Sequence, residues 1–503
     1  MSGSLDGKVR LSISAAIVSD GVAVPERTFN VVTVGWDRRL VERLYDPIAA
    51  RGAAGFFHVM PPRYVRHEWP DLAGRADLRF FRDRLQQPIG DADPQLLASL
   101  ERPDLPTVHN MIMGDRIVSK IDPADAMRYA TFLARRLIDL YRELRADVII
   151  GSFDALHGGI ALAVARHLNI PWFALNFSVI PAGLVCFCDR MSPAARVQLG
   201  ARPIDELRAH AETALKEFES RKLQAPAYIA PSRPSLSRRL SGLPARLSST
   251  LRTFRRARQR EHLQFTEGRA RYSVTAAMAL LRGRDRARQA IEEVPTLAAP
   301  AGSPYVLFGL HFQPESSIDV WAPFFSNQMW VIELLSRSIP ASHKLFVKIH
   351  KSDVANHSRA QLERMRSFPG VELVRPFADT RRLIEGADLI IGIQGTMGLE
   401  AALLGKPVIM LGESPVAMFP SATRVGEITE LPQLIRRKLA EPAPERGRIV
   451  DAYAAYLAPF MPASHNDWNL ELSEQAIERF ALCFDALRQH LTVRSATRLP
   501  ATS

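Results

Sequence analysis

Residues 387–412 constrain the fold of this chain more than any other stretch. An apolar run ends in a glycine-rich turn around Gly395, a short helix carrying Glu400 follows, and a second apolar run begins after Pro407. This order predicts strand, turn, helix and strand, with main-chain N–H groups and a helix N-terminus at the carboxyl end of a buried strand. α/β proteins hold phosphate groups at such points. The stretch therefore predicts a site for a nucleotide sugar.

Apolar runs alternate with helical segments in two series and predict two parallel sheets with right-handed crossovers. The expected strands are 29–36, 54–60, 147–153 and 170–177 in the first series, and 304–310, 344–350, 371–375, 387–393 and 407–411 in the second. The expected helices are 124–145, 158–168, 322–338, 356–367, 379–386, 398–404 and 471–492. We therefore predict an α/β protein with two Rossmann-like domains facing a cleft.

The alternation breaks off in an arginine-rich, helix-forming region between the two series. We expect an N-terminal acceptor domain at 1–201, a helical insertion at 202–300 and a C-terminal nucleotide-sugar-binding domain at 301–465. The remainder, 466–503, is expected to contain a helix that crosses back over the domains.

The net charge of +12 lies in the insertion. The segment 233–288 holds fifteen arginines, no lysine and three acidic residues, so the rest of the chain is formally neutral. Three interpretations are open: a solvated basic insertion, a helix on an anionic membrane surface, and a nucleic-acid contact. No aromatic stacking platform accompanies the charge, and we expect no nucleic-acid partner. On a membrane, Arg255, Arg256, Arg258 and Arg260 would meet anionic headgroups.

The composition is 47% hydrophobic and 23% charged, as in ordinary globular chains with full cores. The N-terminus has no apolar stretch of secretory type, and the three cysteines fit a reducing compartment. We expect a cytoplasmic protein, peripheral on the inner face of the plasma membrane.

Four segments of residues 304–412 resemble the capsule polysaccharide biosynthesis family, which includes GT-B glycosyltransferases of bacterial surface carbohydrates. They are 311–315 (HFQPE), Asn327-Gln328, 347–350 (VKIH), and 395–401 (GTMGLEA) with Gly405-Lys406-Pro407. Family members typically show KEHP where this chain has Lys348-Ile349-His350-Lys351, so the Glu and the Pro are replaced here.

The resemblance implies transfer of a sugar from a nucleotide donor, which leaves as a phosphate. Without a metal, protein donors must meet the charge that builds on the leaving group. Lys348 and His350 end a strand on the expected cleft side, and the resemblance gives His350 a contact with the phosphate. Gly395 and Thr396 offer N–H and hydroxyl donors. Each assignment competes with a structural role in a turn or at a strand end.

Three further side chains are candidates for the sugar, the base or the ribose. Glu400 lies one helical turn beyond the glycines, where a carboxylate binds ribose hydroxyls or balances the helix dipole. Gln313 and Glu315 follow a strand and either bind the sugar or base or form the entry turn of the next helix.

The acceptor hydroxyl needs a general base from the N-terminal half. Asp154 and His157 follow a buried strand and precede a helix, and Asp37 follows another strand. Asp154 is also a candidate helix cap.

We predict a metal-independent glycosyltransferase without a cofactor, using a nucleotide-sugar donor, CMP-linked by family analogy, and a lipid-linked or oligosaccharide acceptor. The alternatives on the same fold are a UDP-sugar 2-epimerase and a teichoic-type glycerophosphotransferase. A non-catalytic component of capsule assembly or export is the third alternative.

Overall fold

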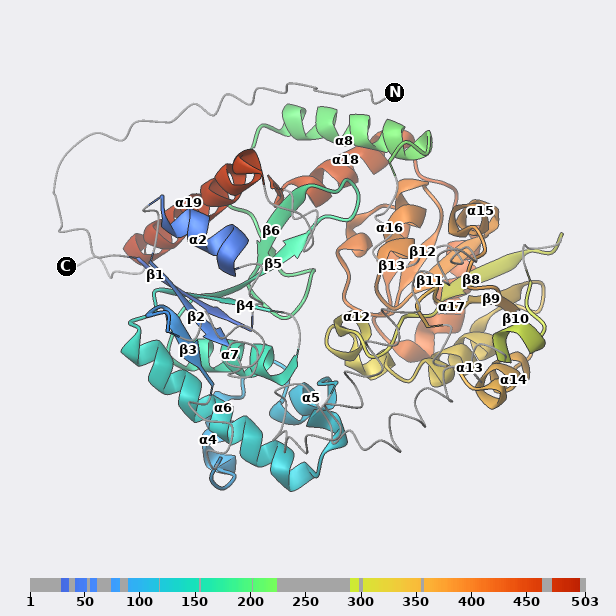
Figure 1. Cartoon of the computed structure of the whole chain (residues 1–503). Helices are drawn as coiled ribbons and strands as arrows, with labels where there is room; N and C mark the ends of the chain where they lie inside the picture. Colours follow the sequence, from blue (N-terminus) through green and yellow to red (C-terminus); the bar gives the residue numbers. More distant parts are fainter. Residues whose placement is uncertain are drawn as a thin grey trace, which may run out of the picture.

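The strand order 3-2-1-4-5 occurs twice in the computed structural model of this chain (Figure 1). The structure describes residues 29–35, 41–51, 55–60, 74–81, 89–116, 118–152, 155–200, 202–223, 290–297, 302–353, 357–463 and 473–497. Figure 1 shows the two sheets side by side, the N-terminal one in blue and teal and the C-terminal one in yellow and orange. The predicted α/β class with two parallel-rich sheets is confirmed.

The N-terminal sheet runs in the order β14-β6-β5-β4-β1-β2-β3, with β7 paired to β6. Its five strands from β5 to β3 are parallel, whereas β6, β7 and β14 are added by antiparallel pairing. The strands are β1 (Asn30–Val34), β2 (Gly55–Met60), β3 (Leu78–Phe80), β4 (Val148–Gly151), β5 (Trp172–Phe177), β6 (Leu184–Cys188), β7 (Arg196–Val197) and β14 (Met461–Pro462).

The C-terminal sheet runs in the order β10-β9-β8-β11-β12-β13, and all its pairs are parallel. This is the 3-2-1-4-5-6 order of nucleotide-binding folds. Its strands are β8 (Tyr305–Gly309), β9 (Lys344–Lys348), β10 (Val371–Val374), β11 (Leu389–Gly392), β12 (Val408–Met410) and β13 (Ala422–Arg424).

Helices cover both faces of both sheets, and the central strands are therefore mostly apolar. The helices are α2 (Asp46–Ala49), α4 (Pro94–Leu100), α5 (Val108–Met113), α6 (Pro123–Glu143), α7 (Ala155–His167), α8 (Ile204–Glu219), α12 (Ser316–Asp319), α13 (Gln328–Ser338), α14 (Arg359–Arg366), α15 (Thr380–Gly386), α16 (Thr396–Leu403), α17 (Leu431–Ala440), α18 (Arg446–Leu457) and α19 (Glu474–Thr497). Residues such as Val32, Ile149, Leu307 and Ile391 are fully buried between these layers.

One predicted helix begins later than expected. The segment predicted at 322–338 starts with a short 3-10 turn at Pro323–Phe325, and α13 follows only at Gln328. The side chain of Asn327 accepts a hydrogen bond from the main-chain nitrogen of Trp330 and so caps the later start.

The segments that join the two halves pack against each other across the top of Figure 1. α8 follows the N-terminal sheet and packs along α18, which belongs to the C-terminal half. The chain then returns through β14, and α19 lies against the N-terminal half. There Phe484 packs edge-on against Tyr45 and Phe56. The predicted domain boundaries at 201, 300 and 465 stay predictions, and residues 224–289 of the insertion lie outside the described part of the chain.

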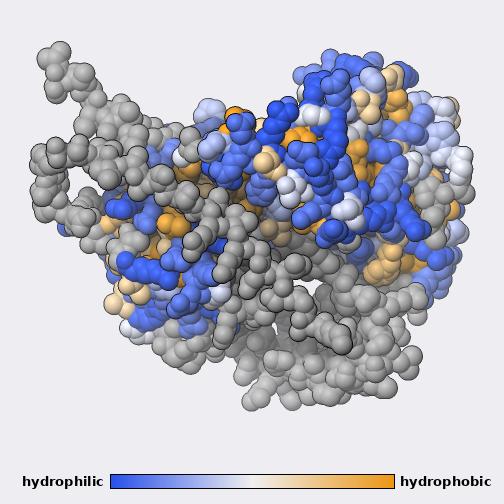
Figure 2. Space-filling view, turned by 90° about the horizontal axis from the view of Figure 1, so that it is seen from above, coloured by the Kyte–Doolittle hydropathy of each residue, from blue (hydrophilic) through white to orange (hydrophobic). Residues whose placement is uncertain are grey.

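Hydrophilic residues make up most of the described surface in the view from above (Figure 2). Within the described ranges, every helix is too short or too polar to cross a membrane.

Candidate functional site

The loops after β8 and β11 meet at the carboxyl edge of the C-terminal sheet. These two strands are neighbours, and the chain leaves them toward opposite sides of the sheet, which makes this edge the topological switch point. The main-chain nitrogen of Gln394 donates to Nε2 of His311 at 3.2 Å and joins the two loops. Ligands of open α/β sheets bind outside such a point.

Gly395 sets the geometry of the turn between β11 and α16. Its φ of 90° lies in the left-handed region that favours glycine, and an added Cβ would come within 3.1 Å of the Cε1 atom of His311. Since the N-cap residue of α16 has no side chain, the first main-chain N–H groups of this helix are not capped by it. The turn thus offers N–H donors at the edge of the sheet.

Lys348 is the last residue of β9 and is almost fully buried. Its Nζ donates to the carbonyl oxygen of Pro376 at 3.1 Å, in the turn that follows β10. Burial, and next the charge of Lys351, lower the pKa of Lys348 to about 8, although the carboxylate of Glu400 opposes this shift. The site therefore holds a buried ammonium group whose charge depends on pH near neutrality.

His350 follows Lys348 by two residues, and its ring is fixed by its own loop. The main-chain nitrogen of Ser352 donates to its Nδ1 at 3.2 Å, so the neutral ring carries its proton on Nε2. Burial lowers the pKa of His350 below its usual value, with further lowering by Lys348 and Lys351, while Asp353 raises it. His350 is thus a neutral N–H donor at pH 7.

Glu400 lies in α16 and is surrounded by cationic and hydroxyl groups. Burial raises its pKa above the usual value. Arg381 of α15 opposes this shift most, followed by a hydrogen bond from Thr396 and then by Lys351 and Lys348. The carboxylate of Glu400 therefore lies near Thr396 and Lys348, two of the groups predicted to meet the phosphate.

Gln313 and Glu315 take part in the turn that enters α12. Nε2 of Gln313 donates to Oδ1 of Asp319 at 2.8 Å, and the main-chain nitrogen of Glu315 donates to Oδ2 of the same residue at 2.9 Å. Gln328 holds this loop from the other side by donating to Oε1 of Gln313 at 2.9 Å. These are the contacts of a helix-entry turn, and the proposed contact of both residues with sugar or base stays a prediction.

The structure thus gathers most of the predicted donor-site residues at one edge, together with residues that the sequence did not single out. Arg381 is one of these, because nothing in its local sequence shows that α15 lies beside α16. In the sequence, Lys351 stands out only as a departure from the KEHP of the family. The feature that could have identified both residues as site candidates is their position in the chain, just beyond the carboxyl ends of β9 and β10. The gathered set consists of His311, Lys348, His350, Lys351, Arg381, Gly395, Thr396 and Glu400.

The N-terminal sheet has its own switch point between β1 and β4. His157 lies there in the first turns of α7, with its ring against the main chain of Gly35 and 5.8 Å from the centre of the Phe81 ring. Asp154 and Asp37 lie outside the described residues. The assignment of the general base stays a prediction.

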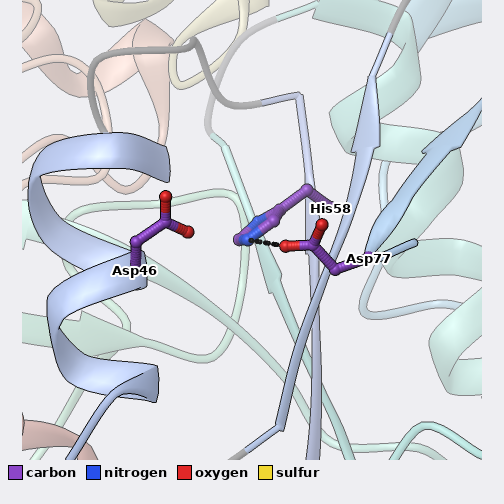
Figure 3. A group of neighbouring side chains, drawn as sticks. All are labelled: Asp46, His58 and Asp77. Carbon is purple, nitrogen blue, oxygen red and sulfur yellow. Dashed lines mark ion pairs between the residues drawn. The ribbon is translucent and has the colours of Figure 1, made fainter. Parts of the chain in front are cut away.

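A second polar group lies between α2 and the N-terminal sheet and includes Asp46, His58 and Asp77, shown in Figure 3. His58 is buried, and its Nδ1 lies 2.7 Å from the hydroxyl of Thr33. The ligand atoms of the three residues lie within 4.8 Å of one another, a spacing that a metal ion requires. However, the guanidinium of Arg75 hydrogen-bonds to both carboxylates and balances their charge. We interpret the group as a charge-balanced structural cluster.

The predicted membrane-surface residues Arg255, Arg256, Arg258 and Arg260 lie outside the described part of the chain. Their role also stays a prediction.

Two parallel-rich sheets with nucleotide-fold strand order, and polar groups gathered at one switch point, define the class of α/β proteins built from two Rossmann-type units. Residues 245–457 match the family described as Capsule polysaccharide biosynthesis protein. The predicted resemblance is confirmed, and the match extends beyond residues 304–412 on both sides.

Several solved structures are similar to this chain. KpsC of Thermosulfurimonas dismutans, a beta Kdo 2,4 transferase, is 15% identical with a TM-score of 0.34, over 61% of this chain and 79% of that one. UDP-GlcNAc 2-epimerase from Neisseria meningitidis is 14% identical with a TM-score of 0.23, over 86% and 99%. A glycosyltransferase from Rickettsia africae is 10% identical with a TM-score of 0.30, over 94% and 100%. No curated protein sequence matches the chain.

Proposed function

We propose that this protein is a glycosyltransferase of capsule or related surface-polysaccharide synthesis. It transfers a sugar from a nucleotide donor, held by the C-terminal half, to a lipid-linked or glycan acceptor. The observation that carries the proposal is the meeting of Lys348, His350, Thr396 and Glu400 at the switch point of the C-terminal sheet. Family analogy favours a CMP-linked donor.

The cationic groups match the charge of the leaving phosphate. Lys348 uses one N–H for Pro376, and an ammonium group has two further N–H donors that can meet an anion. The N–H groups at the start of α16 add main-chain donors, and the positive end of the helix dipole lies there. In our proposal these groups, without a metal ion, stabilise the negative charge that builds up as the glycosidic bond to the phosphate breaks.

His350 and Glu400 have separate roles in this proposal. Because Nδ1 of His350 accepts from Ser352, its Nε2–H donates to the departing phosphate oxygen. Glu400 accepts hydrogen bonds from the ribose hydroxyls, with Thr396 holding its carboxylate. A ribose contact requires the ionised form of Glu400, which the surrounding cations favour.

Thermal unfolding with a panel of CMP-, UDP- and GDP-sugars tests the donor site, since a ligand that binds only the folded state raises the melting temperature. We expect one nucleotide class to stabilise the parent protein and not Glu400→Gln. Stabilisation of both proteins alike by every nucleotide, or of neither by any, would contradict the proposal.

Product analysis with a labelled nucleotide sugar then separates the reaction classes. A glycosyltransferase releases nucleotide only when an acceptor is present, whereas an epimerase converts the sugar without one. The base candidates are tested in the same assay, where we expect Asp154→Asn to reduce kcat more than His157→Gln and neither to change nucleotide affinity.

We also propose that the arginine-rich segment binds the anionic inner face of the membrane, which would bring the enzyme to a lipid-linked acceptor. Replacement of Arg255, Arg256, Arg258 and Arg260 by Gln should reduce co-sedimentation with vesicles rich in anionic lipid. Four exposed arginines of the described region, Arg337, Arg359, Arg382 and Arg488, give a matched control with the same charge change. Equal sedimentation of mutant and parent would reject the membrane role.

A further inference from the structure

Arg381 of α15 is held in a fixed position by two neighbours. Its Nε donates to Oε1 of Glu385 at 2.8 Å, one helical turn further on. Its guanidinium lies over the ring of Phe218, with 4.5 Å between the guanidinium carbon and the ring centre. The side chain is only 14% exposed, although an arginine on a surface helix usually extends into water.

Phe218 comes from the other part of the chain. It lies near the end of α8, the helix that follows the N-terminal sheet, and is buried. Three residues later Arg221 donates to Oε2 of Glu385 at 2.9 Å. The single charge of Glu385 is therefore shared by two guanidinium groups, and the positive charge of Arg381 is only partly balanced by this partner.

The remaining charge of Arg381 acts on Glu400. α15 packs against α16, and Arg381 is the group that most favours the ionised form of Glu400. The other groups that face this carboxylate are Thr396 on its own helix, and Lys348 and Lys351 at the end of β9. Burial of Glu400 disfavours its ionised form and so acts against all these groups. Without Arg381 the carboxylate would lose its strongest electrostatic support.

We propose that Arg381 is a positioning residue for Glu400, and that Phe218 and Glu385 hold Arg381 in place. α8 is then part of the donor site, because its end fixes the arginine that supports the proposed ribose ligand. The ribose contact rests on the proposed function, but the electrostatic effect of Arg381 on Glu400 does not.

A double-mutant cycle without any nucleotide tests the electrostatic interaction between Arg381 and Glu400. Melting temperatures are measured at pH 7.5 for the parent, Arg381→Gln, Glu400→Gln and the double variant. We expect Arg381→Gln to lower the melting temperature in both backgrounds, because its contacts with Glu385 and Phe218 are lost in each, and to lower it more in the parent than when residue 400 is Gln. Arg382→Gln is the control, since this neighbouring side chain is 80% exposed and should have little effect in either background.

Equal effects of Arg381→Gln in both backgrounds would overturn the inference, because they would mean that Arg381 only pins α15 to α8. Since this cycle needs no ligand, its result stands whether or not the chain binds a nucleotide sugar.

Calorimetric titration with CMP and with UDP tests the link to the donor site. We expect Arg381→Gln to weaken binding of whichever nucleotide the parent binds by about tenfold or more, Arg381→Lys to restore part of it, and Phe218→Leu to give an intermediate loss. The double variant Arg381→Gln, Glu400→Gln should bind no more weakly than Glu400→Gln alone. Unchanged binding by Arg381→Gln would overturn the positioning role, whereas no binding by the parent would count against the proposed function.

Discussion

The main-chain nitrogen of Gln394 donates to Nε2 of the buried His311 at 3.2 Å, across the switch point between β8 and β11. For this bond Nε2 must carry a lone pair, so His311 is neutral with its proton on Nδ1. The main-chain nitrogen of His311 in turn donates to Oε1 of Gln328 at 2.7 Å. The two loops that carry the proposed donor site are thus joined through one uncharged imidazole.

Acid should therefore weaken the fold through His311. Burial, and then the charge of His350, lower the pKa of His311 from 6.5 to about 4. The unfolded chain thus binds a proton at this residue before the folded chain does, and stability falls as the pH decreases from 6.5 to 4. At most about 3 kcal/mol is lost in this way.

Denaturant unfolding at several pH values between 7 and 4 measures this effect. His311→Gln, which offers an acceptor that does not titrate, should lose less stability over this range than the parent. The control is His343→Gln. His343 directly precedes β9 and so lies at the edge of the sheet opposite to His311. Parallel curves for the parent and His311→Gln would contradict the expected role.

Gly395 gives a test of the turn itself. Because its φ is 90° and an added Cβ would press on the His311 ring, Gly395→Ala should lower the free energy of unfolding by about 1–2 kcal/mol. Gly426→Ala is the matched control, since a Cβ there meets open space. Gly426→Ala is expected to change the free energy of unfolding by less than about 0.5 kcal/mol. The two variants are compared by denaturant unfolding at pH 7, and equal stability would show that the turn tolerates a side chain.

The sequence predicts many of the longer elements because each of these rests on a run of apolar residues or a repeated helical face, but α17, α18 and β6 were not predicted. Predicted strands such as 344–350 and 387–393 lie within two residues of β9 and β11 at each end. β3 and β13 were not predicted, since each has only three residues and depends on the neighbouring strand rather than on its own pattern.

The candidate site was predictable to the extent that it follows from strand ends. Lys348, His350 and Thr396 follow parallel strands at the same edge, and the structure brings them together. The entry turn formed by Gln313 was one of its two predicted roles. The contacts of Arg381 depend on the packing of α8 and were not visible in a local pattern.

The charge of Lys348 should make nucleotide binding depend on pH. Its pKa of about 8 in the free protein means that the ammonium is present at pH 7 and is lost as the pH rises through 8. Nucleotide affinity should therefore fall by up to about tenfold per pH unit above 8. Lys348→Gln should bind more weakly at pH 7 and show a flatter pH profile.

Calorimetric titration from pH 7 to 9.5 measures both quantities. Lys351→Gln is the comparison, because its side chain is exposed and its loss should cost less affinity. A parent affinity that stays constant over this range would argue against contact between Lys348 and the phosphate.

His350 should act on the rate of transfer more than on binding. If its Nε2–H donates to the departing oxygen, His350→Ala should lower kcat by about 10²–10⁴-fold with little change in nucleotide affinity. His350→Gln places an N–H donor near the position of Nε2 and should retain more activity than His350→Ala. The order is measured by single-turnover assays with the donor that stabilises the parent, and the circular dichroism spectrum of each variant checks its fold. Equal rates for the two variants would mean that the donor at Nε2 is not what His350 contributes, and parent-like rates for both would remove the residue from the mechanism.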